Sequence, residues 1–291
     1  MEPLVDHEYK ILQLQKQVRE LSARLRQSSR NLLGGDMTLY VRTDGDDDNN
    51  GFSNTASGAF ATVQAAVDAV SHLYDPGDHD VVIQLGSGTW TLASTLVLKR
   101  HCGANYVTVR GDTTTPGNVI IQYDGGTVLH CLSEWAPWKI EGLTVRRAST
   151  GNEILVLAER GNLKIGRLAV GNPGTSYQFF GTSHSYMSST GATIDVTSGA
   201  TGLLRVADHS VGYFNSTTFV FPGGGAAFTT TMSAVNQSGL HVNGNTFTNG
   251  GLVTGTRYTS NELSHIRTNG GGAAYIPGNV AGTTANGGIY T

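Results

Sequence analysis

Apolar residues spaced seven apart fill the first thirty-two positions and constrain the architecture of this chain most. One series consists of Leu4, Ile11, Val18, Leu25 and Leu32, and a second lies three residues later at His7, Leu14, Leu21 and Ser28. This spacing predicts a coiled coil of about four to five heptads over residues 1–33. A helix with so narrow an apolar stripe cannot bury it alone, whereas a helix packed on a globular core usually has a wider one. We therefore expect a homo-oligomer joined through Leu4, Ile11, Leu14, Val18, Leu21, Leu25 and Leu32.

The composition changes completely after this seam. Gly contributes 39 of the 291 residues and only 14% of residues are charged, against about 25% in an average soluble protein. Low charge together with many turn-forming residues fits short strands joined by tight turns. The net charge of −3 gives no argument for a nucleic-acid partner.

The start of the chain and its two cysteines bear on the compartment. Met1 and Glu2 lead directly into the heptads without a signal-peptide pattern, and no apolar run reaches 18 residues, so we expect neither a Sec pathway nor membrane insertion. Cys102 and Cys131 make neither a disulfide framework nor a metal site. Both are expected to be small buried hydrophobic residues. We assign no metal to the scattered histidines and expect no cofactor.

Short alternating segments return at nearly constant spacing along the rest of the chain. Ile140–Val145 and Ile165–Val170 align at an offset of 25, and later segments continue at offsets of 26, 25 and 28. Upstream, Val81–Leu85 and Tyr106–Arg110 are again 25 apart. The alternation of apolar and polar residues indicates strands with one buried face. The alignment places five apolar residues in one register, namely Leu143, Leu168, Ile194, Phe219 and Phe247.

A strand repeat of this length predicts an all-β fold, a right-handed single-stranded parallel β-helix (a solenoid) over residues 81–268. About seven turns would give a column about 35 Å long. An antiparallel sandwich or barrel would also have many short strands, but its hairpin signals are less regular here than the 25-residue return. Residues 269–291 are Gly-rich, lack the strand pattern and are expected to form a C-terminal tip.

Residues 34–80 are expected to link the stalk to the solenoid and to cap it. Phe60, Val63, Val67, Val70 and Tyr74 fall on one helical face. The first rung of a solenoid exposes apolar core and has to be covered. The short helix predicted here is suited to that position.

One stretch of this linker resembles a known family. Tyr40-Val41, the Asp/Asn/Gly-rich loop and Ala59–Asp68 together resemble the start of pectate-lyase-like β-helix domains in bacteriophage tailspikes and tail fibres. A preceding coiled-coil stalk is also similar to these proteins. The resemblance implies a homotrimeric virion protein, folded in the cytoplasm of the bacterial host and attached to phage tail or capsid proteins through its N-terminus.

Family members bind bacterial surface polysaccharide, and some also cut it. The resemblance therefore implies a fibre or spike for host adhesion, with a polysaccharide depolymerase (a glycoside hydrolase or lyase) or a structural decoration of head or tail as alternatives. Hydrolysis needs two carboxyl groups facing one groove. Glu141 and Asp195 are the catalytic candidates because both lie inside strand-like segments. Lyase chemistry would need cations, and six basic residues cluster between the same turns, namely Lys139, Arg146, Arg147, Arg160, Lys164 and Arg167.

The loop Asp44–Gly51 carries carboxylates at alternate positions, as calcium loops do, but departs from the EF-hand pattern at Asn49 and Thr55. A solvated turn is the expected alternative.

For sugar binding, exposed aromatic rings are required beside polar groups. The candidates lie in two loops and are Trp135, Trp138, Tyr177, Phe179 and Tyr186.

Overall fold

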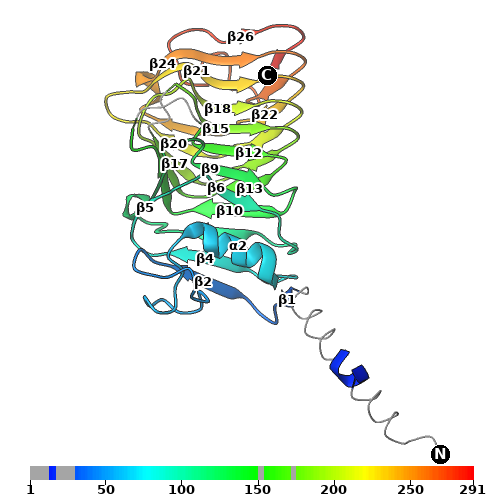
Figure 1. The fold of residues 1–291 in the computed structure, drawn as a ribbon. Coiled ribbons are helices and arrows are strands. Elements are labelled where there is room, and N and C mark those ends of the chain that lie inside the picture. The colour runs from blue at the N-terminus through cyan, green and yellow to red at the C-terminus, as the bar shows by residue number, and fades with distance from the viewer. Residues whose placement is uncertain (1–12, 18–29, 150–153, 172–174) are drawn as a thin grey trace, which may run out of the picture.

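The chain folds into a parallel β-solenoid of about eight turns (Figure 1). The computed structural model describes residues 13–17, 30–149, 154–171 and 175–291. Three sheets of ten, seven and eight strands run along the column, and every pairing between the described strands is parallel, as in β11 (Leu143–Arg146) with β14 (Leu168–Gly171). The predicted all-β parallel solenoid is therefore confirmed, and the antiparallel alternative is wrong.

A complete turn of the chain adds one strand to each of the three sheets, whereas the first and last turns are partial. The ten-stranded sheet contains β2 (Met37–Val41), β4 (Val81–Leu85), β7 (Val107–Arg110), β10 (Pro137–Glu141), β13 (Asn162–Ile165), β16 (Tyr186–Ser188), β19 (Val211–Tyr213), β22 (Gly239–His241), β25 (His265–Arg267) and β27 (Ile289–Tyr290). The seven-stranded sheet contains β5 (Gly88–Thr91), β8 (Val119–Gln122), β11, β14, β17 (Thr193–Val196), β20 (Thr218–Val220) and β23 (Thr246–Thr248). The eight-stranded sheet contains β6 (Leu96–Lys99), β9 (Leu129–Leu132), β12 (Val156–Glu159), β15 (Tyr177–Thr182), β18 (Gly202–Val206), β21 (Ala227–Ala234), β24 (Thr254–Ser260) and β26 (Thr283–Thr284).

The predicted apolar register is confirmed. Leu143 pairs with Leu168, which pairs with Ile194, and the series continues to Phe219 and Phe247. The first four are fully buried, because inward positions of successive rungs stack on one another. The upstream offset was wrong by one residue, since Val81 pairs with Val107.

A sharp corner divides segments that the periodicity treats as single strands. Gly142 separates β10 from β11 and has a φ of +69°, a conformation that side chains rarely adopt. A Cβ atom at this position would lie 2.7 Å from the carbonyl carbon of Asp112 and the amide nitrogen of Thr113. Glycine is therefore required where the chain turns from the ten-stranded to the seven-stranded sheet.

The opposite corner, between the eight- and ten-stranded sheets, carries a row of buried serines. The row consists of Ser185, Ser210, Ser238 and Ser264. The backbone N–H of each of the first three donates to the hydroxyl of the next, over 3.0–3.2 Å. Each serine follows two residues with positive φ, so these bonds satisfy backbone groups at a tight, buried turn.

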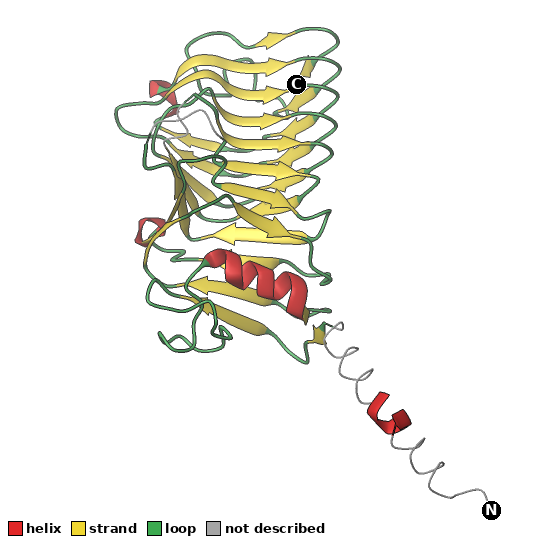
Figure 2. Ribbon diagram, viewed as in Figure 1, coloured by secondary structure: helices red, strands yellow, loops and turns green. Residues whose placement is uncertain are grey.

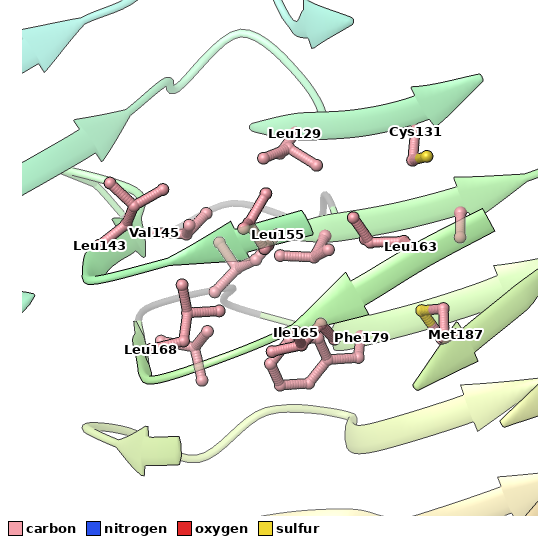
Figure 3. Packing of buried hydrophobic residues seen from close by; sticks show 14 of the residues in the cluster. Leu129, Cys131, Leu143, Val145, Leu155, Leu163, Ile165, Leu168, Phe179 and Met187 are labelled. Carbon is pink, nitrogen blue, oxygen red and sulfur yellow. The ribbon is translucent and has the colours of Figure 1, made fainter. Parts of the chain in front are cut away.

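The interior of the column is continuous and apolar. Figure 3 shows Leu143 and Leu168 of the seven-stranded sheet in one interior cluster with Ile165 of β13, Phe179 of β15 and Leu155, which precedes β12. Further up the column, aromatic rings fill the interior. The ring centroids of Phe179 and Phe214 lie 6.2 Å apart, those of Phe214 and Phe219 6.4 Å, and those of Phe219 and Phe247 5.7 Å.

The predicted capping helix is α2 (Val63–Leu73), near the N-terminal end of the column (Figure 2). It contacts β6, β2 and β4 and buries Val63, Ala66, Val67 and Val70, so it covers the first turn of the core. Phe60 and Tyr74 flank the helix instead of belonging to it. The remaining short elements are η1 (Pro116–Asn118), η2 (Gly250–Leu252) and a parallel pair formed by β1 (Asn31–Leu32) and β3 (Tyr74–Asp75).

The Asp-rich loop covers the free edge of β2. The backbone N–H of Tyr40 donates to the carbonyl of Gly51, that of Phe60 to the carbonyl of Tyr40, and that of Arg42 to the carbonyl of Phe60. The side chain of Asp47 accepts bonds from the backbone N–H groups of Ala61 and Thr62 and from the hydroxyl of Thr62, the residue that caps α2. An exposed strand edge invites pairing with other chains, and this loop prevents it.

The N-terminal segment is described only in part. Residues 13–17 are helical and all five are exposed, Leu14 by 59%. Leu4, Ile11, Val18, Leu21 and Leu25 lie outside the described residues. Leu32 lies in strand β1, so its assignment to the coiled coil is wrong. The trimeric coil stays a prediction.

The C-terminal residues also differ from expectation. Residues 269–291 were expected to lack strands, but β26 and β27 continue the eight- and ten-stranded sheets. The rings of Tyr258 and Tyr290 stack with their centroids 3.7 Å apart. This segment is therefore a last, partial turn of the solenoid.

The cysteines and the helices complete the fold. Cys131 is buried as predicted, whereas Cys102 is exposed and its sulfur accepts a bond from Arg30 over 2.6 Å. Within the described residues, no helix is both long and apolar enough to cross a membrane.

Candidate functional site

Glu141 lies at the end of β10 between two cations. Its Oε1 accepts a bond from Nε of Arg110 over 2.7 Å, and its Oε2 lies 2.6 Å from Nζ of Lys139. The side chain is only 12% exposed. Burial would raise the pKa of this carboxyl, but the hydrogen bonds and charges of Lys139 and Arg110 outweigh burial and hold the pKa below its usual range.

This environment predicts an acid-dependent contribution to stability. Because the pKa of Glu141 is lower in the folded than in the unfolded chain, its contribution is fully present above about pH 4.5 and is lost as the pH falls through the folded pKa. We expect Glu141→Gln to lower the free energy of unfolding by about 1–3 kcal/mol at pH 7, and the difference to shrink below pH 4.5. Urea denaturation at pH 3–8 measures it.

The exposed Glu262 provides the matched control for this experiment. Glu262→Gln changes the charge of the chain equally but lies outside the ion pairs of β10. A Glu141→Gln variant as stable as Glu262→Gln at pH 7 would contradict the role given to the ion pairs.

Asp195 is held by a different cation on a different sheet. It lies in β17 of the seven-stranded sheet, and its Oδ2 is 2.7 Å from Nη2 of Arg167. Among the described residues, no hydrogen bond joins Asp195 to Glu141. A general acid in glycoside hydrolysis needs a raised pKa, whereas that of Glu141 is lowered. The structure therefore gives both predicted catalytic carboxylates cationic partners and does not pair them.

The predicted basic cluster is also dispersed. Lys139 and Lys164 are in register on the ten-stranded sheet, whereas Arg146 bonds Gln122 on the seven-stranded sheet. Arg147 is buried and donates to the carbonyls of Asp124 and Gly126. These residues surround the column instead of lining one site, because consecutive strands of each turn belong to different faces.

Two predicted sugar-binding residues are part of the core. Trp138 and Phe179 are fully buried, and the indole nitrogen of Trp138 donates to the carbonyl of Lys99 over 2.7 Å. Their assignment as ligand contacts is wrong. Trp138 occupies the inward register between Val107 and Leu163, which its 25-residue distance from Leu163 could have revealed.

The other three candidates lie on the outside. Trp135 is 56% exposed at the corner before β10. Tyr177 begins β15, and its hydroxyl accepts a bond from Arg205, whose guanidinium lies 5.3 Å from the rings of both Tyr177 and Phe180. Tyr186 begins β16 on the ten-stranded sheet and is half-buried.

Tyr186 is the first ring of a longer row that the sequence reading missed. Its ring centroid lies 5.7 Å from that of Tyr213, which stacks on His241 at 4.3 Å with an interplanar angle of 18°. We call Tyr186, Tyr213 and His241 the ring row. Tyr213 pairs directly with His241 in the strand register, so extending the 25-residue alignment to outward positions would have found both.

The rings of the row are partly buried, and burial changes the pKa of the histidine among them. Burial lowers the pKa of His241, and the nearby Arg267 and His265 lower it further, so the imidazole is neutral at pH 7. Within the described part of the chain, no protein group bonds the hydroxyl of Tyr186 or of Tyr213. The row therefore offers aromatic edges and free hydroxyls to a ligand.

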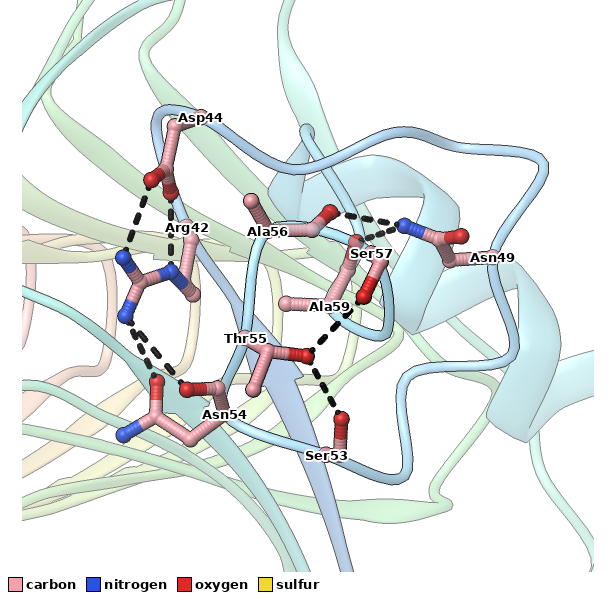
Figure 4. A network of polar contacts seen from close by, with 9 residues as sticks. All are labelled: Arg42, Asp44, Asn49, Ser53, Asn54, Thr55, Ala56, Ser57 and Ala59. Carbon is pink, nitrogen blue, oxygen red and sulfur yellow. Dashed lines mark hydrogen bonds and ion pairs between the residues drawn. The ribbon is translucent and has the colours of Figure 1, made fainter.

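The Asp/Asn-rich loop, considered above for calcium, uses its polar groups internally. Asp44 forms two bonds with the guanidinium of Arg42 over 2.8 and 3.0 Å, and the side-chain amide of Asn49 donates to the carbonyls of Ala56 and Ala59 (Figure 4). The side-chain hydrogen bond from Arg42 holds the pKa of Asp44 below its usual range. Across the described ranges, no group of three or more His, Cys, Asp or Glu residues is arranged to hold a metal ion.

Comparisons with known proteins add no functional assignment. No family model and no curated protein match the chain. A pectin methylesterase from Aspergillus niger is similar in structure, with 16% identity and a TM-score of 0.46 over 90% of this chain and 85% of that one. YbhC from Escherichia coli has 14% identity and a TM-score of 0.37 over 89% and 77%. The parallel solenoid rests on the strand pairing of the chain itself.

Proposed function

We propose that this protein is a bacteriophage fibre or spike that binds a surface polysaccharide of the bacterial host. The observation that carries the proposal is the ring row on the outside of a rigid solenoid. Polysaccharides are extended chains of hydroxyl-bearing rings, and they are bound by aromatic side chains beside polar groups. Three consecutive rungs that each present such a side chain suit a ligand that is itself long.

The N-terminal heptads give the proposal its assembly. In this hypothesis three chains join through the coiled coil, and the N-terminus attaches the trimer to tail or capsid proteins of the virion. Three copies of one weak site on a rigid unit bind a repetitive surface with much higher avidity than one copy. The resemblance of residues 39–70 to phage tailspikes and tail fibres supports this arrangement.

We expect the purified full-length protein to retain at least one polymer from a panel of bacterial surface polysaccharides without shortening it. The polymers are immobilised, and both retained protein and newly formed reducing or unsaturated ends are measured. Retention without new ends is the result expected of an adhesin, because neither Glu141 nor Asp195 lies in a paired-carboxylate arrangement.

The same assay separates the alternatives. Steady release of ends would make the protein a depolymerase, and the double variant Glu141→Gln, Asp195→Asn would then test the two carboxylates. Cleavage that survives both changes places the chemistry elsewhere. A trimer that retains none of the polymers contradicts adhesion and favours a structural decoration of head or tail.

A further inference from the structure

The outer face of the ten-stranded sheet has a charge opposite to that of the whole chain. Its strands carry four lysine and arginine side chains, namely Arg110, Lys139, Lys164 and Arg267, and a single carboxylate, Glu141. The sheet therefore has a net charge of +3, whereas the chain has 19 basic and 22 acidic residues and a net charge of −3. The strands of the seven-stranded sheet carry Arg146 and Asp195 and are neutral, and those of the eight-stranded sheet carry Lys99, Arg205, Arg257 and Glu159, a net charge of +2. The ten-stranded sheet therefore has the largest net positive charge of the three.

Lys164 and Arg267 share one outward register with two members of the ring row, Tyr213 and His241. Lys164 pairs with Ser188, Ser188 with Tyr213, Tyr213 with His241 and His241 with Arg267. Five successive rungs, at about 4.8 Å each, span about 19 Å along the axis. Cations thus stand at both ends of a line whose middle is aromatic, with Tyr186 beside it.

The ammonium group of Lys164 lies over an aromatic ring, and no ion pair within the described residues neutralises it. Its Nζ lies 5.5 Å from the centre of the Tyr106 ring, and within the described residues no carboxylate lies in ion-pair distance of it. Lys139 differs, because it is neutralised by Glu141 at 2.6 Å. Arg267 is exposed, and no carboxylate of the described residues lies in ion-pair distance of it either, whereas Arg110 is paired with Glu141. Lys164 and Arg267 are therefore the two cations of this face best able to bind an anion from solution.

The spacing of the rings argues for a glycan in preference to a nucleic acid. A nucleic-acid base binds an aromatic side chain by stacking on a free face of its ring. The ring centroids of Tyr213 and His241 lie only 4.3 Å apart, so no base fits between these two rings. Sugar hydroxyls need only hydrogen-bonding groups at the ring edges, which the hydroxyls of Tyr186 and Tyr213 supply.

We propose that this face binds an acidic polysaccharide lying along the solenoid axis, with its anionic groups on Lys164 and Arg267 and its hydroxyls on Tyr186, Tyr213 and His241. This inference rests on the proposed function and adds the chemical class of the ligand and its position. The bound polymer crosses successive rungs, so one chain of polysaccharide contacts residues far apart in the sequence.

The first experiment tests the class of ligand. Each polymer retained in the panel is compared with the same polymer after chemical reduction of its carboxyl groups to alcohols, and retention is measured with full-length protein at 50 and 200 mM salt. We expect retained polymers to be acidic, with retention falling at least about tenfold on reduction, because two charge-assisted bonds are lost. Retention of neutral or reduced polymers with unchanged affinity would overturn the inference about the ligand class and leave the proposed adhesion intact. No retention of any polymer would contradict both the inference and the proposed adhesion.

The second experiment tests the position. Lys164→Gln with Arg267→Gln is expected to weaken binding at least about tenfold, and Tyr213→Phe, which keeps the ring and removes only the hydroxyl, about three- to tenfold. The matched control, Arg146→Gln with Arg205→Gln, removes the same charge from the other two faces and is expected to bind normally. Equal loss in both double variants, no loss in either, dissociation of the oligomer by the first, or displacement of the polymer by single-stranded DNA would each overturn the inference.

Discussion

Phe219→Ala is expected to lower the free energy of unfolding by about 3–5 kcal/mol, the largest single-residue effect on stability that we predict. Phe219 is fully buried and lies between Phe214 and Phe247 in the aromatic interior. A close-packed interior relaxes only partly around a lost ring, so a cavity adds to the lost burial. Urea unfolding followed by far-UV circular dichroism measures the change.

The control for this prediction is a phenylalanine on the outside of the same column. Phe180 lies outward on the eight-stranded sheet beside Arg205 and is half-buried. Phe180→Ala is expected to cost about 1 kcal/mol. Equal costs at the two positions would contradict the assignment of inward and outward faces.

Placing aspartate at two seam positions, Leu14→Asp with Leu21→Asp, is expected to convert the predicted trimer into a monomer. Two charges per chain would have to be buried in the coiled-coil interface, which is unfavourable without partners. Retention on a polysaccharide surface should then fall by about 10²–10⁴, since avidity is lost while each single site is unchanged. Sedimentation velocity gives the oligomeric state, and surface retention gives the avidity.

Lys16→Asp with Ala23→Asp is the matched control for the stalk. These positions have the same seven-residue spacing but lie opposite the seam. This variant should remain a trimer with normal retention. A wild-type chain that sediments as a monomer would refute the stalk altogether, and a monomeric variant with unchanged retention would refute the role of avidity.

The solenoid and its inner register could be determined from the sequence, because strand alternation and a 25-residue repeat are both local patterns. Leu143, Leu168 and Ile194 could be aligned without a structure, since stacked rungs require similar side chains at equivalent positions. The cap could be read from the apolar spacing of α2 in the same way.

The candidate site could not be read in this manner. Outward positions have no packing requirement that repeats from rung to rung. Extending the alignment would place Tyr213 beside His241, but nothing in the sequence marks the two residues as a site. Trp138 and Phe179 were assigned to loops, because a proline and a cluster of aromatic residues obscure the alternation of β10 and β15. Glu141 was recognised as rigidly held, but its partner Arg110 lies 31 residues earlier.

The sequence by itself thus determined that the chain is a stack of parallel strands with an apolar interior and a covered N-terminal end. Only the tertiary structure decided which side chains meet on the surface. Each turn distributes its residues over three faces, and neighbours on one face come from different turns. The positive charge of the ten-stranded sheet and its row of rings therefore arise from stacking, which brings together residues that the linear sequence separates.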